Sequence, residues 1–458
     1  MSENENFLKI AIEIAQKENV DEVIAQRIKG KTYQIRFSNS LIDNSKIWNN
    51  DILELFLAKG KRTTQIDIEA PTPTKIRSTI IEASKFLLKL PESFLYNGME
   101  SSLYTYKKFD QIFDPKIMNF SEKAPELVNA AIQTSLESGA KKVAGVLYFG
   151  YSKTDLLTSY GNEGSYDGSY YRFTIRSFVD AESSGQGIVC SRNLSGVEKK
   201  FMQAGVKAGE IAKMAVGGTQ GHPGKYDVIM SPTVAANVLG QVFDGVNPLK
   251  IMIGMSPLKN EHLGKQIASE DFTVVDNALL DNGLGSRPFD VEGTPTGKTP
   301  IFTNGILEGL LQNTSTSKME QVENTGNSIF FDFGIGSKFL APGPSNIVIS
   351  GGNYTLEEII AECKKPTIYL TSNWYTRFTN MMDGLFSTIP RDGMFLIENG
   401  EIKKPVRKLR LSDNLLRICS NISAIGKDVQ QIYWWEVKTP TFLPTIKVDN
   451  CTITAATQ

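Results

Sequence analysis

Apolar side chains recur with helical spacing at the start of the chain. Residues 5–18, ENFLKIAIEIAQKE, place them at positions 7, 8, 10, 11, 14 and 15, which predicts an amphipathic helix. Residues 76–89, 124–138 and 232–243 predict further helices. Between the first two helices, DEVIAQRIKGKTYQIRFSNS predicts two strands joined at Gly30–Lys31, and DILELFLAKG predicts another strand after an Asn-Asn turn.

The helix and strands at the start of the chain resemble a later stretch. Val23 matches Val143 and Asn39 matches Asn162, where a second helix precedes AKKVAGVLYFGYSKTDLLTSYGNEG. The offset between the two stretches drifts only from 120 to 123 residues. We interpret this as an internal duplication of a helix-plus-antiparallel-strand unit. The alternative is that any two units of a helix and a hairpin look alike.

The pattern changes from Lys225 onward. Short strands such as YDVIM, NIVIS, TIYL and MFLIENGEI are separated by Gly, Pro and Asn turns. Strands that cluster apart from helices predict an α+β fold rather than alternating α/β units. We therefore predict an N-terminal α+β domain at 1–90, a middle α+β domain at 91–224 and a β-rich C-terminal domain at 225–458.

Composition narrows the class of protein. The 458 residues are 41% apolar and 22% charged, which is typical of soluble globular proteins, and the net charge of −1 gives no reason to expect nucleic acid or an anionic membrane as a partner. No apolar run is long enough to span a bilayer, and the N-terminus lacks a secretory pattern, so we expect a cytoplasmic protein. The four cysteines are scattered, which favours buried thiols over a disulfide framework.

Histidine is scarce. The chain has two, His222 and His262, forty positions apart, so it cannot build a helical zinc site that needs two histidines within one or two turns. Each histidine is more often a surface or capping residue than a catalytic base in such turn-rich contexts.

One loop concentrates candidate chemistry. Residues 286–309, SRPFDVEGTPTGKTPIFTNGILEG, surround Asp290 and Glu292 with turn-forming residues. On a strand this spacing would point both carboxylates to one face, where they could act as acid and base or bind a metal. The favoured interpretation is that they accept main-chain N–H bonds in a turn. A phosphate loop is excluded because Gly293 is one residue too close to Gly297-Lys298-Thr299.

An ordered set of short blocks resembles the TldD/PmbA family. The blocks are DFTVVDNALLDNG (271–283), FDVEGTPTGKTPIFTNGILEGLLQNTSTSKM (289–319), ENTGN (323–327), SNWYTRF (372–378), FSTIPRDGMFLIENGEIKKPVR (386–407) and ISAIGKD (422–428). The N-terminal and middle sections fit the family layout more loosely, so the resemblance covers almost the whole chain. Asp290, Glu292, Gly293, Asn304 and Arg377 lie in these blocks, and we take them as candidates for a groove or interface loop.

The resemblance implies an α+β fold and a function in proteolysis. Members of the family, once labelled modulators of DNA gyrase, are similar to metallopeptidases in which a TldD subunit pairs with a TldE (PmbA) subunit. The pair degrades unfolded peptides and trims leader peptides. Zinc lies in the TldD subunit, held by an HExxxH helix at the start of the C-terminal domain and by a late cysteine.

This chain departs from the family at each zinc ligand. The matching helix, SPTVAANVLGQVFDGVN (231–247), holds no histidine and no glutamate, and Cys451 lies beyond the position of the family cysteine. We therefore expect no catalytic residue, cofactor or metal in this chain and zinc in a TldD-like partner. The hypotheses are a non-catalytic TldE-like subunit, a homodimeric peptide-binding protein, or a peptidase that uses another metal site, such as Asp290, Glu292 and His262.

Overall fold

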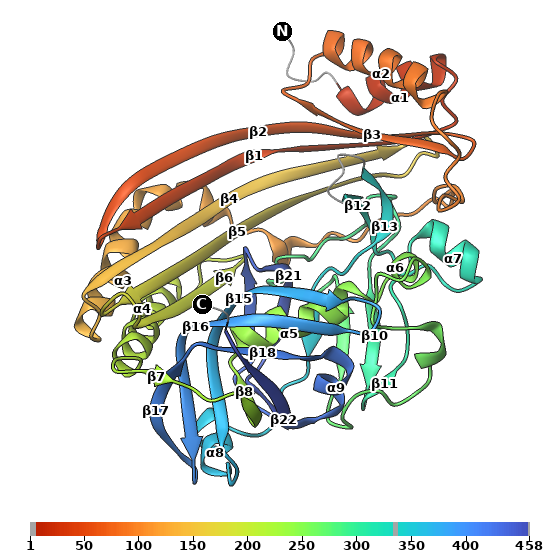
Figure 1. Cartoon of the computed structure of the whole chain (residues 1–458). Coiled ribbons are helices and arrows are strands. Elements are labelled where there is room, and N and C mark those ends of the chain that lie inside the picture. The colour runs from red at the N-terminus through yellow and green to blue at the C-terminus, as the bar shows by residue number, and fades with distance from the viewer. Residues whose placement is uncertain (1–5, 333–337, 457–458) are drawn as a thin grey trace.

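The computed structural model describes residues 6–332 and 338–456 (Figure 1). A long, twisted N-terminal sheet lies over a second, β-rich part of the chain. The mixed α+β class predicted from sequence is confirmed. Among the described residues, no helix has the length and apolar character needed to cross a membrane.

The N-terminal sheet is antiparallel and has the strand order β3-β2-β1-β4-β5-β6. Its strands are β1 (Glu22–Ser38), β2 (Leu41–Lys59), β3 (Arg62–Glu69), β4 (Lys142–Thr158), β5 (Glu163–Phe178) and β6 (Ser184–Ser191). Its helices are α1 (Phe7–Lys17), α2 (Pro73–Leu87), α3 (Ala124–Glu137) and α4 (Val197–Met214), with the 3-10 turns η1 (Asp110–Ile112) and η2 (Pro115–Glu122). The predicted domains 1–90 and 91–224 contribute three strands each to this single sheet.

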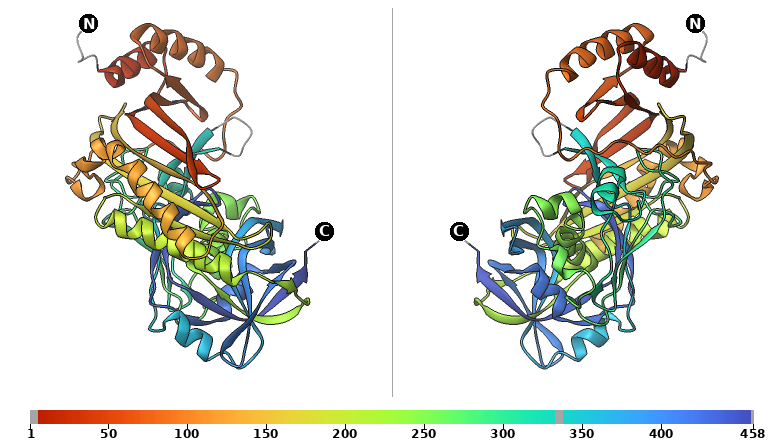
Figure 2. Two further views of the ribbon diagram at one scale, coloured as in Figure 1. Left: turned by 90° about the vertical axis from the view of Figure 1, so that its left-hand side faces the viewer. Right: turned by 90° about the vertical axis from the view of Figure 1, so that its right-hand side faces the viewer.

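The predicted duplication is visible in the order of elements. Each half runs helix, three strands, helix, and β1 and β4 both have 17 residues. The two copies meet through the antiparallel β1–β4 pair, in which Lys31 lies opposite Tyr151. Each copy covers one end of the long strands with its own helix pair, as Figures 1 and 2 show.

Successive side chains of β1 point to opposite faces of this sheet, and the two faces contact different parts of the chain. Val23 and Ala25 pack under α1 and α2, and Ile35 and Phe37 pack under α3 and α4. Because side chains alternate along a strand, the intervening Ile24 points to the opposite face. There it joins a cluster that includes Phe289 and Leu340 from the C-terminal part. The even-numbered positions of β1 therefore face the C-terminal domain.

The expected break at Gly30–Lys31 is wrong, because β1 runs unbroken through it, and β2 likewise runs through the expected Asn-Asn turn. Gly30 does not form a turn but allows β1 and β4 to approach each other closely. A Cβ at this position would lie 2.0 Å from the main-chain oxygen of Tyr151 on β4. Glycine inside a strand often marks a close approach of two backbones. In sequence, such a glycine looks the same as one in a turn.

The C-terminal part contains a six-stranded sheet, a mixed eight-stranded sheet and the hairpin β12–β13. The six-stranded sheet has the order β11-β10-β9-β14-β21-β20. In the larger sheet, β15 pairs with both β8 and β16, so β15, β8, β22, β18 and β16 form a closed circuit. The strands are β7 (Thr219–Gln220), β8 (Gly224–Met230), β9 (Val274–Asn277), β10 (Lys298–Thr303), β11 (Ile306–Leu307), β12 (Ser328–Asp332), β13 (Lys338–Pro342), β14 (Ile347–Ile349), β15 (Thr367–Asn380), β16 (Leu385–Glu398), β17 (Glu401–Arg407), β18 (Leu409–Asn414), β19 (Ile422–Ile425), β20 (Gln430–Trp434), β21 (Val437–Leu443) and β22 (Ile446–Ala455).

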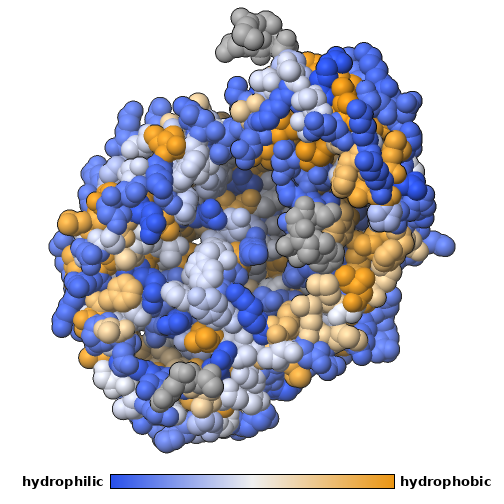
Figure 3. Space-filling model, turned by 45° about the horizontal axis from the view of Figure 1, so that its top comes forward, coloured by the Kyte–Doolittle hydropathy of each residue, from blue (hydrophilic) through white to orange (hydrophobic). Residues whose placement is uncertain are grey.

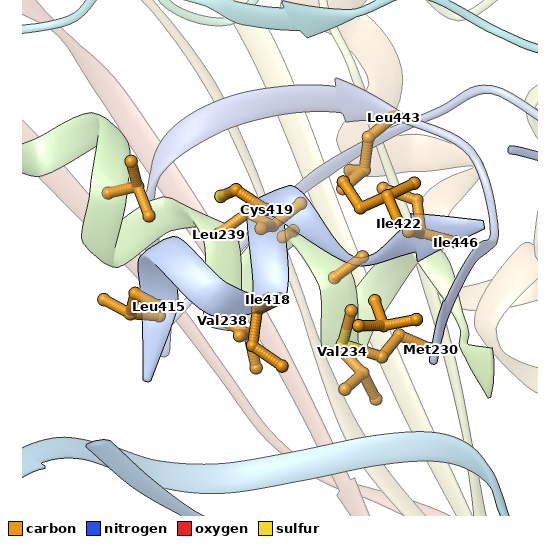
Figure 4. Close-up of a cluster of buried hydrophobic side chains, with 14 of the residues drawn as sticks. Met230, Val234, Val238, Leu239, Leu415, Ile418, Cys419, Ile422, Leu443 and Ile446 are labelled. Carbon is orange, nitrogen blue, oxygen red and sulfur yellow. The ribbon is translucent and has the colours of Figure 1, made fainter. Parts of the chain in front are cut away.

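Helix α5 (Pro232–Asp244) lies in the main core of this domain and confirms the helix predicted over 232–243. Ser231 caps its N-terminus by accepting the Val234 N–H, and proline occupies the first turn. Figure 4 shows Val234, Val238 and Leu239 of α5 packed near α9. The other short helices are α6 (Pro248–Met252), α7 (Thr314–Glu320), α8 (Leu356–Ala361), α9 (Leu415–Ser420) and the 3-10 turn η3 (Asn260–His262).

Gly30→Ala should destabilise the protein, because its methyl group would meet main-chain atoms that cannot rotate away. We expect a loss on the order of 2–4 kcal/mol, visible as a lower melting temperature. Gly297→Ala is the matched control, since its Cβ would meet no atom within 4 Å. Equal melting temperatures for the two variants would contradict the assignment of Gly30 to close strand approach.

Candidate functional site

The loop at 289–296 lies where the two parts of the chain meet. Phe289 is buried against the C-terminal face of the N-terminal sheet, together with Ile24 and Leu156. Its ring lies 4.6 Å from that of Tyr106 and 5.4 Å from that of Tyr166. The loop therefore connects two hydrophobic units that are far apart in sequence.

Asp290 organises this loop through its carboxylate. The side chain is 1% exposed, and it accepts the N–H groups of Glu292, Thr294 and Ser328, each at 2.9 Å. Asp290 N–H in turn donates to the Thr294 carbonyl. These bonds close the turn on itself and tie it to the start of β12. The interpretation favoured from sequence, that the carboxylates accept main-chain N–H groups, is confirmed, whereas the strand geometry weighed against it is wrong.

Glu292 is fully buried beside Asp290. One carboxylate oxygen accepts the Thr314 N–H at 3.3 Å, at the start of α7, and the other has no hydrogen-bond partner among the described residues. Burial, with the neighbouring Asp290 charge, raises the pKa of Glu292 to about 8. Burial also raises the pKa of Asp290, although its three N–H donors oppose that rise. Burial and the Asp290 charge favour the neutral form of Glu292, which has fewer hydrogen-bond donors than Asp290.

Gly293 has a left-handed backbone with φ of 84°. A Cβ here would lie 3.0 Å from both the Tyr106 hydroxyl and the Asn162 side chain. The Tyr106 hydroxyl donates to the Gly293 carbonyl at 2.5 Å, and Asn162 is itself buried and bonded to the segment at 102–104. Both the conformation and the space therefore require glycine.

The two other candidates lie on separate elements. Asn304 is exposed in the β10–β11 hairpin turn, where it and Gly305 have positive φ values. Arg377 lies on β15 with 64% of its side chain exposed, 3.6 Å from Glu436. Neither forms a hydrogen bond with the loop at 289–296 in the described chain. A groove or interface role for them stays a prediction.

Helix α5 does not fit a zinc ion. The polar side chains along it are Thr233, Asn237, Gln241 and Asp244, and the described residues contain no group of three His, Cys, Asp or Glu side chains able to hold a metal. Cys451 is buried in β22 with its thiol near the Val448 carbonyl, and its pKa is raised to about 12 by burial. The prediction of four buried free cysteines is confirmed.

The alternative metal set also fails to form. His222 is exposed, and His262 accepts the Lys259 N–H at 3.1 Å as the cap of η3. Because Asp290 and Glu292 are buried and bonded to main-chain N–H groups, they are not grouped with His262 as metal ligands. The expectation that each histidine is a surface or capping residue is confirmed.

Sequence reasoning missed Asn237. Its side chain is 1% exposed, and neither its oxygen nor its nitrogen has a hydrogen-bond partner among the described residues. A Cβ at Gly240, one turn further along α5, would meet no atom within 4 Å. An asparagine within the otherwise apolar middle of a helix was the available signal. A buried amide without partners is energetically unfavourable, which marks this helix face as unusual.

On the face shown in Figure 3, hydrophilic residues predominate, and the hydrophobic ones form separate patches around a hollow. Trp435 and Tyr375 are 52% and 45% exposed, and their rings lie 6.0 Å apart. Tyr375 adopts a positive φ of 56°, at a bulge in β15, and its N–H donates to Glu436. This exposed aromatic pair is held by local hydrogen bonding rather than by burial.

Comparison with known proteins assigns this two-part α+β architecture to one class. Residues 223–455 match the family model of the PmbA/TldA metallopeptidase C-terminal domain. Because the match covers slightly more than half of the chain, and curated PmbA and TldD relatives also align with it, the chain belongs to the PmbA/TldD family.

Three relatives illustrate how far the likeness extends. A protein from Methanothermobacter thermautotrophicus named metalloprotease is 26% identical over 68% of this chain and 70% of its own length. The crystal structure of TldE from Thermococcus kodakarensis covers 98% of this chain and 100% of that chain, with 20% identity and a TM-score of 0.80. A Bacteroides thetaiotaomicron structure described as a candidate modulator of DNA gyrase covers 99% of both chains, with 21% identity and a TM-score of 0.83.

Gly293→Val should lower the melting temperature, because it combines a strained backbone with contacts to Tyr106 and Asn162. The backbone term alone is on the order of 1–3 kcal/mol. Gly196→Val provides the control, since Gly196 has a φ of 63° but no atom within 4 Å of its Cβ position. A Gly293→Val variant that melts no lower than Gly196→Val would show that the contacts with Tyr106 and Asn162 are unimportant.

Glu292→Gln should reduce the pH dependence of stability. A carboxyl whose pKa is raised in the folded state stabilises the protein at low pH, and that contribution disappears as pH rises through about 8. Glutamine does not titrate. The melting temperature of the variant should therefore fall less than that of the wild type between about pH 5 and about pH 9. The exposed Glu308→Gln is the control. Parallel curves for wild type and Glu292→Gln would contradict the raised pKa of Glu292.

Proposed function

We propose that the chain is a non-catalytic, TldE/PmbA-like subunit that pairs with a TldD-like zinc metallopeptidase and helps to form the complex that cleaves peptides. The observation that carries this proposal is the chemistry of α5. A catalytic zinc needs three nitrogen, sulfur or carboxylate oxygen ligands and an open position. The amides of Asn237 and Gln241 do not replace imidazoles, and Asp244 is already paired with Lys250 at 2.5 Å.

The shape of the chain supports pairing. Its fold matches that of TldE over nearly the whole length, so loss of the ligands has not been accompanied by loss of the domain that surrounds them. The buried core around α5 is intact, with Val234, Val238 and Phe243 fully enclosed. A fold retained without its metal ligands favours a role in assembly and substrate containment over hydrolysis.

The partner surface is expected to include the exposed aromatic residues of the C-terminal domain. Trp435 and Tyr375 lie beside Arg377, whose guanidinium is 5.7 Å from the Tyr375 ring. Aromatic residues and arginine are enriched in the parts of interfaces that carry most of the binding energy. This arrangement supports the assignment of Arg377 to an interface.

Co-expression with the nearest relative that carries HExxxH is the test. We expect the two chains to co-purify and peptide cleavage to fall at least about tenfold when this chain is omitted, because an incomplete complex loses substrate positioning. The cleavage should be sensitive to chelators, since the zinc belongs to the partner. Undiminished cleavage without this chain, or recovery of only self-associated chain, would favour the homodimeric peptide-binding protein instead.

Asp290→Asn and Glu292→Gln in the same complex test whether the two carboxylates act in cleavage or only in maintaining the structure of the loop. Each change preserves size and removes a charge, and we expect the partner's rate to stay within a few-fold of the wild type. Loss of cleavage from an intact, stable complex would place the loop in the active site and contradict its architectural role.

A further inference from the structure

A polar groove of about 720 Å³ separates α4 from the edge of the C-terminal domain. Its floor is the end of β6, at residues 188–191, and its second wall is β20 with Gln430 and Gln431. Both β6 and β20 are terminal strands of their sheets. The groove is therefore a seam between the duplicated sheet and the C-terminal domain, and it lies apart from the loop at 289–296 and from α5.

Two lysines of α4 face this groove. Lys200 and Lys207 are seven residues apart, which places both on one side of the helix, with Gln203 between them. No ion pair involving either lysine exists within residues 6–332 and 338–456, and the groove lining contains no carboxylate. The charge of Asp428 acts on Lys207, but both Asp428 oxygens are already bonded to Thr445, each at 2.8 Å.

The rest of the lining adds no negative charge. The thiol of Cys190 donates to the Gln431 carbonyl at 3.2 Å, and burial raises its pKa to about 12, so the floor stays neutral. Burial also lowers the pKa of Lys207, although part of the residue remains exposed to the groove. An anionic ligand would supply the counter-charge that this lysine lacks.

The wall opposite the lysines is fixed in place. The Gln431 side chain accepts the Leu284 N–H at 2.8 Å and donates to the Asn282 carbonyl at 3.3 Å. Arg192, next to the groove, donates to the carbonyls of Gly283 and Leu284 at 2.9 and 2.6 Å. The turn at 282–284 is thus held against β20 by side chains from both parts of the chain, which makes the groove a built feature rather than a gap between mobile loops.

We propose that this groove binds the carboxylates of an acidic peptide segment, with Lys200 and Lys207 as the paired recognition groups. Seven helical residues rise about 10 Å, at ~1.5 Å each. In an extended peptide, side chains four residues apart lie on the same face, about 13 Å apart at ~3.3 Å per residue, and the flexible stems of the two lysines can span that distance. The ligand's identity as a peptide rests on the proposed function, whereas its charge follows from the lysines.

The test measures peptide binding by the purified full-length chain alone, so it does not depend on cleavage by a partner. The probe is a short peptide with a neutral fluorophore, blocked at both ends, carrying two aspartates four residues apart. Its control has asparagine at both places. We expect fluorescence anisotropy to show tighter binding of the aspartate peptide, and added salt to weaken that binding.

Variants then locate the binding site. Lys200→Gln and Lys207→Gln should each weaken binding about fivefold, and the double variant more. Lys199→Gln removes the same charge from the exposed face of α4 and should leave affinity unchanged. Melting curves that match the wild type would establish that the variants fold. Unchanged affinity in the double variant, or equal binding of aspartate and asparagine peptides, would overturn the proposal.

Two further binding measurements distinguish an acidic side chain from a free C-terminus and from a small anion. If the asparagine peptide binds only when its C-terminus is left free, the groove recognises a chain terminus, which would overturn the assignment to acidic side chains. Competition by inorganic phosphate without any binding of the aspartate peptide would mark the groove as a site for small anions and would also overturn it. Failure of the co-expression assay with successful peptide binding would reject the subunit role and leave the groove's charge preference standing.

Discussion

The carboxylate of Asp290 is the constraint on which the junction between the two parts of the chain depends. Three main-chain N–H groups converge on it, and water cannot replace them because the group is buried. The turn that results presents Phe289 to the N-terminal sheet and brings the Gly293 carbonyl to the Tyr106 hydroxyl. Glu292 is enclosed by the same turn, where burial and the neighbouring Asp290 charge raise its pKa.

The duplicated sheet determines what that junction can do. Its long strands bury one face under two helix pairs and give the other face to the C-terminal domain. The two copies are continuous through β1 and β4, whose close approach depends on glycine at position 30. Among the described residues, α4 is the helix that borders the seam groove, and no ion pair of Lys200 or Lys207 forms within that part of the chain. The hydrogen-bonded Asp290 turn at the junction and the lysines of the seam groove both support the proposal of a subunit that binds peptide without cleaving it.

Periodicity predicted the local structure well. Helix α5 could be predicted because its apolar periodicity is local, and the repeated unit because matching residues recur at an offset that drifts only from 120 to 123. Gly30 was misinterpreted because glycine in a turn and glycine at a close strand approach look alike in sequence. The Asp290 turn followed from its composition, but its contacts with Tyr106 and Asn162 could not be predicted, since those residues lie more than a hundred positions away. The spacing of Lys200 and Lys207 was visible, whereas the opposite wall of their groove comes from β20.

The central claim is that this PmbA/TldD family member is a metal-free subunit whose zinc-bearing partner performs hydrolysis. Native mass spectrometry of the chain co-purified with an HExxxH relative, combined with elemental analysis of each separated chain, tests it most directly. The account predicts a heteromer in which zinc accompanies the relative and is absent from this chain at stoichiometric level. A tightly held zinc in this chain alone would contradict the interpretation of α5 and the proposed function with it.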